Sequence, residues 1–384
     1  MTVVATKPEP PSFTRFVTVA ATMGLLGFGG GWVVLGWIRR AFVDERRWIS
    51  ESEFIEYASV ASVLPGTTAP NLLTLLGHRL GGPRWAAVAP AVFVLPSAVL
   101  VAAIAAFYDQ LRGMDFVMRL FDGMGAAVAG VIVAVAISMR RRAVTTLFSG
   151  AIALVAFALV LARMAGLLEV FVAAGVLGAA TMRPKGGPPT GDATALFALA
   201  PAVAVVVPAA TVLGIFWLFA RIGSATFGGG YSMIAAMHDD LVGRGWVDDK
   251  TFSDAIAVGQ ITPGPVALAG TFIGYRVGGL AGAVAATAGM FLPPLAITLA
   301  VARSLASFRS SAAVKGALAG VGAAVVGVIA ASAWSVGQAS VHDMPALVVA
   351  LLACALMVAR PKLSPLWPLF GGALALYAYR KLAR

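Results

Sequence analysis

Two runs of three glycines are the residues of this chain best placed to bind a ligand. Each run follows a phenylalanine and interrupts an apolar, helix-like stretch. A glycine inside a helix costs about 1 kcal/mol relative to alanine, so three in succession predict a break. A broken helix bares backbone N–H groups and half-helix N-termini, which attract anions. The predicted anion-binding glycines are Gly29, Gly30 and Gly31 in the first run and Gly228, Gly229 and Gly230 in the second.

A Pro-Gly pair follows each glycine run at a similar distance. The pairs are Pro65-Gly66 and Pro263-Gly264, and the second continues into Pro265. Residues 50–64 and 66–80 are each too short to cross a bilayer, which takes about 20 residues. They therefore predict a re-entrant hairpin that turns at Pro-Gly and leaves on the side from which it entered. The stretch 14–40, broken at the glycines, is either a second hairpin or an interrupted crossing.

Glycines in membrane helices also serve close helix packing, which is the alternative interpretation of both runs. Because each run is paired with a Pro-Gly turn and the pair occurs twice, we favour a ligand site. Irregular backbone at membrane depth persists only where it is buried in protein or lines a wet cavity.

Two polar side chains lie close enough to these breaks to join such a site. Gln260 precedes Pro263 and carries two amide donors. Arg221 lies six residues before Phe227 inside the apolar stretch LGIFWLFARIGSATF, whereas its counterpart in the first run is Thr22. A charge in an apolar membrane segment is costly and indicates function by default. The alternative, which has equal weight, is that the side chain of Arg221 extends to the membrane–water interface.

Four further charged residues occupy matched positions in the two regions. Arg79 and Arg276 lie at the ends of the predicted hairpins. They are interpreted either as gate charges or as interfacial anchors, and we favour anchors. Glu56 and Asp254 each lie nine residues before the Pro-Gly turn, as proton-relaying carboxylates or, preferably, as helix caps. No group of histidine, cysteine and carboxylate residues has the spacing of a metal site, and no motif indicates a cofactor.

Composition places these residues in a membrane. Of 384 residues, 60% are hydrophobic and 12% are charged, and the mean hydropathy is +0.90. We therefore expect an all-α polytopic membrane protein. The net charge of +11 is attributed to cytoplasmic loops rather than to nucleic-acid binding. The predicted spans include residues 86–107, 123–139, 143–162, 164–182, 279–302, 317–338 and 344–359.

The chain is an internal repeat. Phe28 and Phe227, each followed by three glycines, are 199 residues apart, and Leu95-Pro96 and Leu292-Pro293 are 197 apart. A repeat drifting by two residues over about a hundred is not coincidental. It predicts a first unit at 1–182, a Pro/Gly-rich linker at 183–194 and a second unit at 195–384.

Charge predicts that the two units lie in opposite orientations. The GAAV helix of the first unit is followed by Arg140, Arg141 and Arg142, whereas the matching helix of the second is followed by VGQASVHDM, which lacks lysine and arginine. The loop after the first glycine run is net basic, and the loop after the second is net acidic. Since basic loops stay in the cytoplasm, the pattern predicts an inverted-topology repeat, a common plan of secondary transporters.

These motifs resemble those of the chromate transporter family over residues 14–140 and 212–338. The second unit carries FGGGY, then a tryptophan, GQITPGP, IGY and FLPP; the first carries FGGG, RRWISESEF, LPGT, LGHRLGG and FVLPS. The family commonly has FGGP and QxLPGP in its first unit, where this chain has Gly31 and SVLPGT. Only the second unit keeps Gln260 and Pro265, so the anion site is expected to be asymmetric.

The resemblance implies a multi-pass transporter of the cell inner membrane that exports chromate from the cytoplasm, with sulfate as a chemical look-alike. At roughly 150 mV, a departing dianion gains about 7 kcal/mol from an inside-negative potential. We therefore expect export driven by the potential, with proton antiport and another small anion as alternatives. The partners expected are the oxyanion and the bilayer, and a homodimer is left open. A membrane-embedded enzyme and a channel are the rival classes.

Overall fold

The computed structural model describes residues 11–382 except 29, 183–209, 228–229, 304, 306–310 and 362. Its regular structure is helical, and these described residues contain no β-strand. Within them, four helices are long and apolar enough to cross a membrane: Pro83–Ala106, Asp115–Ala143, Val266–Arg303 and Ala312–Ser340. The expected class, an all-α polytopic membrane protein, is confirmed. The predicted linker 183–194 lies outside the described residues, so the domain boundaries stay a prediction.

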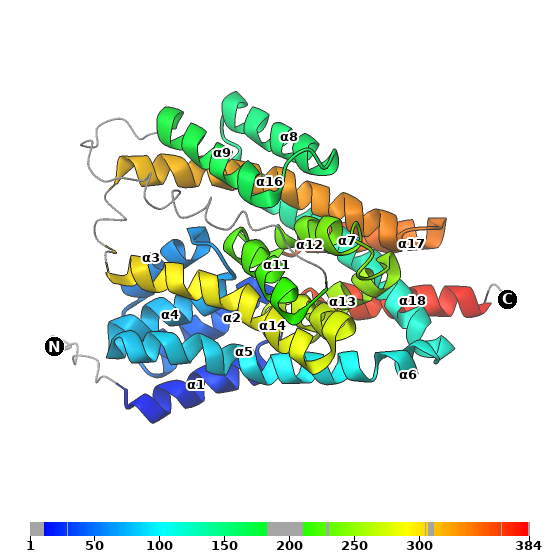
Figure 1. The fold of residues 1–384 in the computed structure, drawn as a ribbon, viewed down its shortest axis with the longest axis horizontal. Coiled ribbons are helices and arrows are strands. Elements are labelled where there is room, and N and C mark those ends of the chain that lie inside the picture. The colour runs from blue at the N-terminus through cyan, green and yellow to red at the C-terminus, as the bar shows by residue number, and fades with distance from the viewer. Residues whose placement is uncertain are drawn as a thin grey trace.

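The helices follow one another in the same order in both halves (Figure 1). The first half contains α1 (Phe13–Leu26), α2 (Gly30–Arg39, continued by a π-helix over Arg40–Glu45), α3 (Glu51–Val63), α4 (Thr68–Gly81), α5 (Pro83–Ala106), α6 (Tyr108–Arg112), α7 (Asp115–Ala143), α8 (Leu147–Leu161) and α9 (Leu167–Thr181). The second half contains α11 (Val212–Ser224), α12 (Met233–Leu241), α13 (Asp249–Ile261), a short 3-10 helix (Val266–Leu268), α14 (Ala269–Arg303), α16 (Ala312–Ser340), α17 (Met344–Ala359) and α18 (Leu366–Leu382).

The glycine runs are hairpin tips rather than interruptions of a straight crossing. Phe16 in the first turn of α1 packs against Phe42 and Trp48, with ring centroids 5.9 and 6.4 Å away. A continuous helix would separate residues 16 and 42 by about 39 Å. In the second half Arg221 of α11 pairs with Asp240 of α12, although a continuous helix would hold them about 28 Å apart. The chain therefore folds back at both runs.

The segments around the Pro-Gly pairs are also hairpins. Ser50 caps α3 in a capping box with Glu53, and Arg79 near the end of α4 forms an ion pair with Glu53 at 3.0 Å. The start of α3 and the end of α4 are thus held together at the open end of the hairpin. In the second half α13 leads to the turn at 262–265, and α14 loses helical geometry at Gly278 and Gly279.

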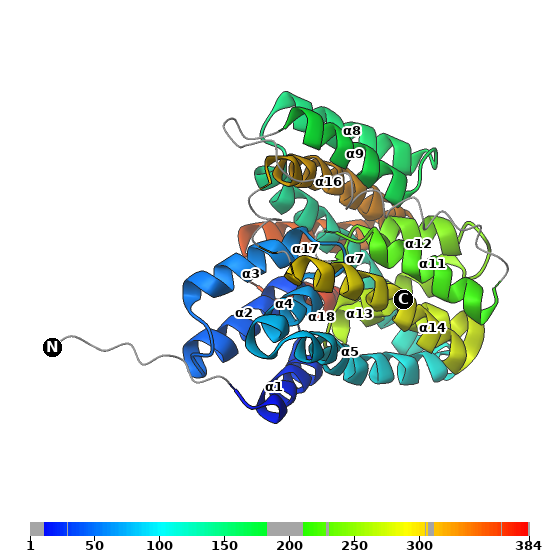
Figure 2. The same cartoon turned by 60° about the vertical axis from the view of Figure 1, so that its left-hand side comes forward.

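Long helices surround the hairpins. In Figure 1, α5 and the part of α14 after Gly279 lie side by side and run in opposite directions, although they occupy equivalent positions in the repeat. Each half also packs its next long helix on the outer pair of the other half: α7 lies against α17 and α18, and α16 lies against α8 and α9 (Figure 2).

The exchanged packing depends on equivalent glycines. A Cβ at Gly130 of α7 would meet the carbonyl group of Ala350, and one at Gly327 of α16 would meet the carbonyl group of Ala153. Both glycines and both partners are separated by 197 residues. The two interfaces therefore bring equivalent glycines against equivalent carbonyl groups.

One end of the molecule carries α6, residues 241–249 and residues 340–343, and we name it the α6 end. Arg112 pairs with Asp248 there, and Ser253 hydrogen-bonds Ser340. The helices that leave this end finish at basic residues on the opposite side: α7 at Arg140, Arg141 and Arg142, α14 at Arg303, and α17 before Arg360.

Candidate functional site

Hairpin tips from both halves meet at the centre of the molecule. The N–H group of Gly66 donates to the carbonyl oxygen of Thr226 at 2.6 Å, and that of Gly264 donates to Gly27 at 3.1 Å. The two glycines are equivalent in the repeat, and so are their two acceptors. Each Pro-Gly turn is therefore joined to the glycine-run hairpin of the other half, in a structure that we call the junction.

Both turn glycines have a backbone conformation that other residues rarely adopt. Gly66 has φ +100° and Gly264 has φ +92°. A Cβ on Gly66 would lie 2.6 Å from Pro294 Cβ, and one on Gly264 would lie 3.0 Å from Ser97 Oγ. Ser97 and Pro294 are also equivalent positions. Glycine is thus required at the two turns by both φ and close packing.

Buried polar side chains hold the turns in place. Asn71 Nδ2 donates to the carbonyl oxygen of Pro65 at 2.8 Å, and Thr298 donates to Asn71 Oδ1 at 3.2 Å. Ser97 donates to the carbonyl oxygen of Gly24 at 2.8 Å, and Ser232 both accepts from and donates to the backbone of Phe227. No motif or spacing in the sequence indicated these residues.

Two side-chain atoms at the junction are buried without a partner among the described residues: Thr67 Oγ1 and Gln260 Nε2. Thr67 and Gln260 are 5% and 3% exposed. The Tyr231 hydroxyl donates to Gln260 Oε1 at 3.4 Å, which leaves the amide N–H groups of Gln260 as free donors. Thr67 also lies against Gly230, because a Cβ at that glycine would be 3.3 Å from Thr67 Cγ2.

A cavity of about 10 Å³ lies beside Thr67 and Gly264, and Gln260 is close to it in the chain but does not line it. The first turn of α4 and the start of the 3-10 helix line it, so backbone N–H groups without helical acceptors border the space. A volume of this size holds about one water molecule. The lining residues are Val34, Thr67, Thr68, Ala69, Phe93, Gly264, Pro265 and Val266.

A larger crevice of about 520 Å³ opens beside the junction between α4, α5 and α14. It shares Thr67, Asn71 and Pro294 with the junction, but its lining is otherwise almost entirely apolar. Transfer of a charge into apolar surroundings without polar partners is strongly unfavourable. An anion would therefore be less unfavourable in the small cavity, which Thr67 and Thr68 line, than in the larger crevice.

The predicted glycine, proline and glutamine residues of the site divide into three groups. Pro65, Gly66, Gln260, Gly264 and Pro265 lie at or beside the junction, together with Pro263 of the same turn and Gly230. Gly30 and Gly31 begin α2. Gly29, Gly228 and Gly229 lie outside the described residues.

Arg221 has a protein partner. Its guanidinium pairs with Asp240, which Arg244 also approaches at 3.5 Å. The side chain of Arg221 is 26% exposed. The pair fastens α11 to the end of α12, and a role of Arg221 in anion binding stays a prediction.

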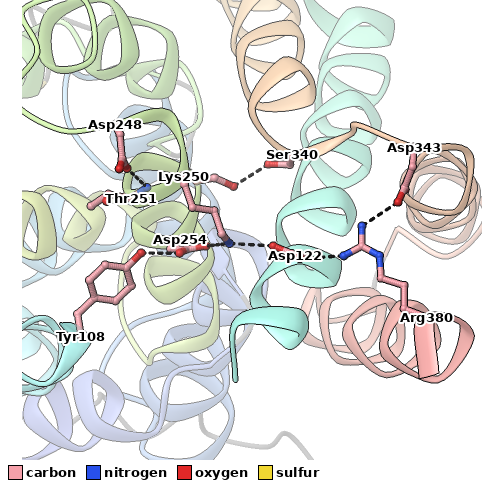
Figure 3. A network of polar contacts seen from close by, with 10 residues as sticks. Tyr108, Asp122, Asp248, Lys250, Thr251, Asp254, Ser340, Asp343 and Arg380 are labelled. Carbon is pink, nitrogen blue, oxygen red and sulfur yellow. Dashed lines mark hydrogen bonds and ion pairs between the residues drawn. The ribbon is translucent and has the colours of Figure 1, made fainter. Parts of the chain in front are cut away.

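The capping interpretation of Glu56 and Asp254 was wrong. Ser50 is the N-cap of α3 and Asp248 is the N-cap of α13, so both acids lie inside their helices. The side chains of Ser50 and Asp248 directly precede their helices and accept hydrogen bonds from N–H groups of the first turn, a position that Glu56 and Asp254 do not occupy. Asp254 is fully buried and accepts from Tyr108 and Lys250, as Figure 3 shows.

Arg79 and Arg276 form different pairs despite their equivalent positions. Arg79 pairs with Glu53 of its own half, whereas Arg276 donates to both carboxylate oxygens of Asp109 in the other half, at 2.8 and 3.0 Å. The interhalf pair belongs to the α6 end. No spacing in the sequence indicated Asp109 as the partner, since the two residues are far apart in the chain.

Loop carboxylates at the α6 end are held in the ionised form. The hydrogen bond from Arg380 lowers the pKa of Asp343, and the N–H group of Ala346 adds to the effect. Partial burial alone would raise the pKa of Asp248, but hydrogen bonds from Thr251 and the charge of Arg112 lower it below its ordinary value.

Comparison with known proteins gives one consistent result. The family model described as chromate transporter matches residues 14–179 and 213–377. The chain is 32% identical to the chromate transport protein of Cupriavidus metallidurans over 96% of this chain and 94% of that protein. It is also 32% identical to the chromate transport protein of Pseudomonas aeruginosa, over 90% and 86%, and to the probable chromate transport protein of Synechococcus elongatus, over 86% of each. No solved structure matches the chain.

Proposed function

The chain belongs to the chromate transporter family, and from this premise we propose that it exports chromate across the cell inner membrane through a binding site at the junction. The family assigns the chain a role in chromate transport as a multi-pass membrane protein. The direction, the driving force and the site are our proposals, and so is sulfate as a chemical look-alike.

One observation carries the choice of site: Thr67 Oγ1 and Gln260 Nε2 are buried and unpaired where the hairpin tips meet. A buried polar atom without a partner costs about 1–3 kcal/mol. An oxyanion accepts hydrogen bonds from hydroxyl, amide and backbone N–H groups, so its binding would remove this cost. The half-helix starts at α4 and Val266 add positive ends of helix dipoles.

The structure corresponds to a closed junction. A cavity of about 10 Å³ is too small for a tetrahedral oxyanion, so the tips must separate before the anion enters. The hydrogen bonds from Gly66 to Thr226 and from Gly264 to Gly27 are the contacts that separation would break or shift. Rocking of one half against the other around a central site is the usual motion of transporters built from inverted repeats.

We propose that the two halves are inverted in the membrane. Equivalent helices α5 and α14 run in opposite directions in Figure 1, and the basic ends of α7 and α14 lie opposite the α6 end. Since basic residues stay in the cytoplasm, the α6 end is assigned to the periplasm. Cysteine labelling tests this assignment in a background without Cys354. A cysteine at Arg141 should react only from the cytoplasm and one at His342 only from the periplasm. Labelling of both positions from the same side of the membrane would contradict the inversion.

We propose that the membrane potential drives export. A dianion leaving at roughly 150 mV gains about 7 kcal/mol, equivalent to about five decades of concentration ratio. In liposomes, collapse of the potential with valinomycin and balanced potassium should stop chromate accumulation, whereas collapse of the pH gradient alone should not. Loss of transport with the pH gradient alone would replace this scheme by proton antiport.

The substrate is tested in inside-out vesicles. Chromate uptake should depend on the protein and should be reduced by excess sulfate more than by phosphate or molybdate, because sulfate is the chosen look-alike. Vesicles without the protein and vesicles with Gly264→Leu are the matched controls. Uptake of another anion, with no uptake of chromate, would contradict the proposed substrate.

A further inference from the structure

A chain of polar contacts links both halves at the α6 end (Figure 3). Asp254 of α13 accepts from the Tyr108 hydroxyl at 2.6 Å and from Lys250 Nζ at 2.7 Å. Lys250 also pairs with Asp122 of α7 at 3.0 Å. Arg380 of α18 then joins Asp122 to Asp343, with both distances 2.8 Å.

This cluster has one negative charge that the cluster itself does not balance. With all groups ionised, its three carboxylates face two cations, Lys250 and Arg380. Asp254 is the deepest member, with a fully buried side chain, whereas Asp122 and Asp343 are 35% and 40% exposed. A buried charge in excess of its partners is costly, and a proton on the buried carboxylate removes it.

The groups around Asp254 come from several elements. Tyr108 and Arg112 belong to α6 and Asp122 to α7, whereas Lys250 belongs to α13 and Asp248 is the N-cap of that helix. Arg112 is engaged by Asp248, and Arg276 of α14 is engaged by Asp109 and lies 5.3 Å from the centre of the Tyr108 ring. These two arginines therefore have carboxylate partners of their own.

The set of equivalent positions, with the two halves exchanged, does not repeat the cluster. The positions equivalent to Lys250, Tyr108 and Asp122 are Ser52, Leu305 and Ala319. Glu56 takes the position of Asp254 and is partly exposed rather than buried. The cluster is therefore not one of the backbone contacts that the two halves duplicate.

The cluster and the junction share one short helix. Asp254 precedes Gln260 by six residues on α13, which corresponds to about 9 Å along the helix axis. The residues between them are buried. A movement of α13 at the α6 end would therefore displace Gln260 at the junction.

We propose that Asp254 is a proton-binding site that controls opening of the α6 end; the inference rests on the proposed function. In the ionised form, Asp254 receives charge-assisted hydrogen bonds from Tyr108 and Lys250, which are about twice as strong as neutral ones. A proton that binds a carboxylate oxygen of Asp254 takes the cluster from a net charge of −1 to neutral. The tie between α6 and α13 then weakens, Lys250 remains with Asp122, and the α6 end opens more readily.

The test is chromate–chromate exchange in liposomes, with equal pH on both sides and the potential clamped at zero. Wild-type exchange should accelerate about tenfold between pH 8 and pH 6. Asp254→Asn, which mimics the protonated acid, should be fast at pH 8 and vary less than twofold. Asp115→Asn is the matched control, because it removes a carboxylate three residues after α6 that is 95% exposed and pairs with Arg119 of its own helix, and it should keep the wild-type profile. The titration of chromate itself is common to all variants.

A second variant covers the case in which Asp254→Asn fails to fold. Tyr108→Phe removes only the hydroxyl that stabilises the carboxylate, so the midpoint of the pH profile should move to higher pH by at least half a unit. An unchanged profile in Asp254→Asn, or in Tyr108→Phe when Asp254→Asn is inactive, would overturn the proton site. Wild-type protein without any chromate exchange would instead overturn the proposed function.

Discussion

The two Pro-Gly turns have the same backbone but different side chains. Gly66 and Gly264 share positive φ values, and their N–H groups donate to equivalent carbonyl oxygens. The side chains around them differ, however: Thr67 of the first half is equivalent to Pro265 of the second, and Ser62 is equivalent to Gln260. The first turn thus contributes an unpaired hydroxyl and the second an unpaired amide.

This difference indicates how the proposed site is divided. The duplicated backbone positions the hairpin tips, while each half supplies a different hydrogen-bonding group at the junction. The asymmetry expected from the sequence motifs agrees with this distribution. Substitutions at equivalent positions should therefore have similar effects on backbone geometry and different effects on anion binding.

The largest effect is expected from Gly264→Leu, which should lower chromate transport at least 100-fold in vesicles. Leucine is strained at φ +92°, and its side chain enters the space occupied by Ser97 and the cavity. Gly66→Leu should have the same effect, because Pro294 lies closer still. Membrane insertion is measured separately by immunoblotting of washed membranes.

The matched control for this effect is Gly279→Leu. Gly279 also has positive φ, at +60°, but no atom lies within 4 Å of a Cβ placed there. Transport at a tenth of the wild-type rate or more is expected. Equal losses at Gly279 and Gly264 would attribute the effect to backbone strain alone and remove the junction from the argument.

A loss of about tenfold is expected from Arg221→Ala, with partial recovery in Arg221→Lys, which keeps the charge but not the planar set of donors. A substitution of Asp240, the partner of Arg221, distinguishes two interpretations of this loss. If Arg221 binds the anion, Asp240→Asn frees the guanidinium and should raise the apparent affinity for chromate. If the pair only fastens α11 to α12, Asp240→Asn should be as harmful as Arg221→Ala. Transport assays over a range of chromate concentrations separate the two.

Sequence patterns predicted the local breaks well because those breaks depend on residue type. Three glycines or a Pro-Gly pair disfavour a continuous helix, so the positions of the breaks were identifiable from the sequence. Whether 14–40 forms a hairpin or an interrupted crossing was not. The contact of Gly66 with Thr226, 160 residues later, depends on how the halves pack and has no local signal. The helix α18 was not among the predicted spans, and its Arg380 therefore escaped notice as a partner of Asp122.

Side-chain partnerships were the least predictable feature. Asp254 was recognised as a matched acid, but the sequence did not distinguish a capping carboxylate from a buried one. Lys250, four residues earlier, has the spacing of a helical ion pair and was the one available signal. Tyr108 and Asp122 come from elements that fold back across the molecule, so no spacing in the sequence indicates them.

A small effect is expected from Ser97→Ala. Loss of this hydroxyl leaves the buried carbonyl oxygen of Gly24 without its donor, at a cost of about 1–2 kcal/mol in the free energy of unfolding. The midpoint of thermal unfolding in detergent should fall by a few degrees, with chromate transport changed less than threefold. An unchanged midpoint would show that the hydrogen bond does not support the junction.

Equilibrium binding of chromate to the purified protein tests the proposed site most directly. Gln260→Met and Thr67→Val remove the unpaired donor and hydroxyl with little change in side-chain volume, and the double variant should bind chromate at least 100-fold more weakly, by about 3 kcal/mol. Ser62→Val, at the position equivalent to Gln260, should change the affinity less than threefold. Wild-type affinity in a folded Thr67→Val, Gln260→Met double variant would contradict an anion site at the junction.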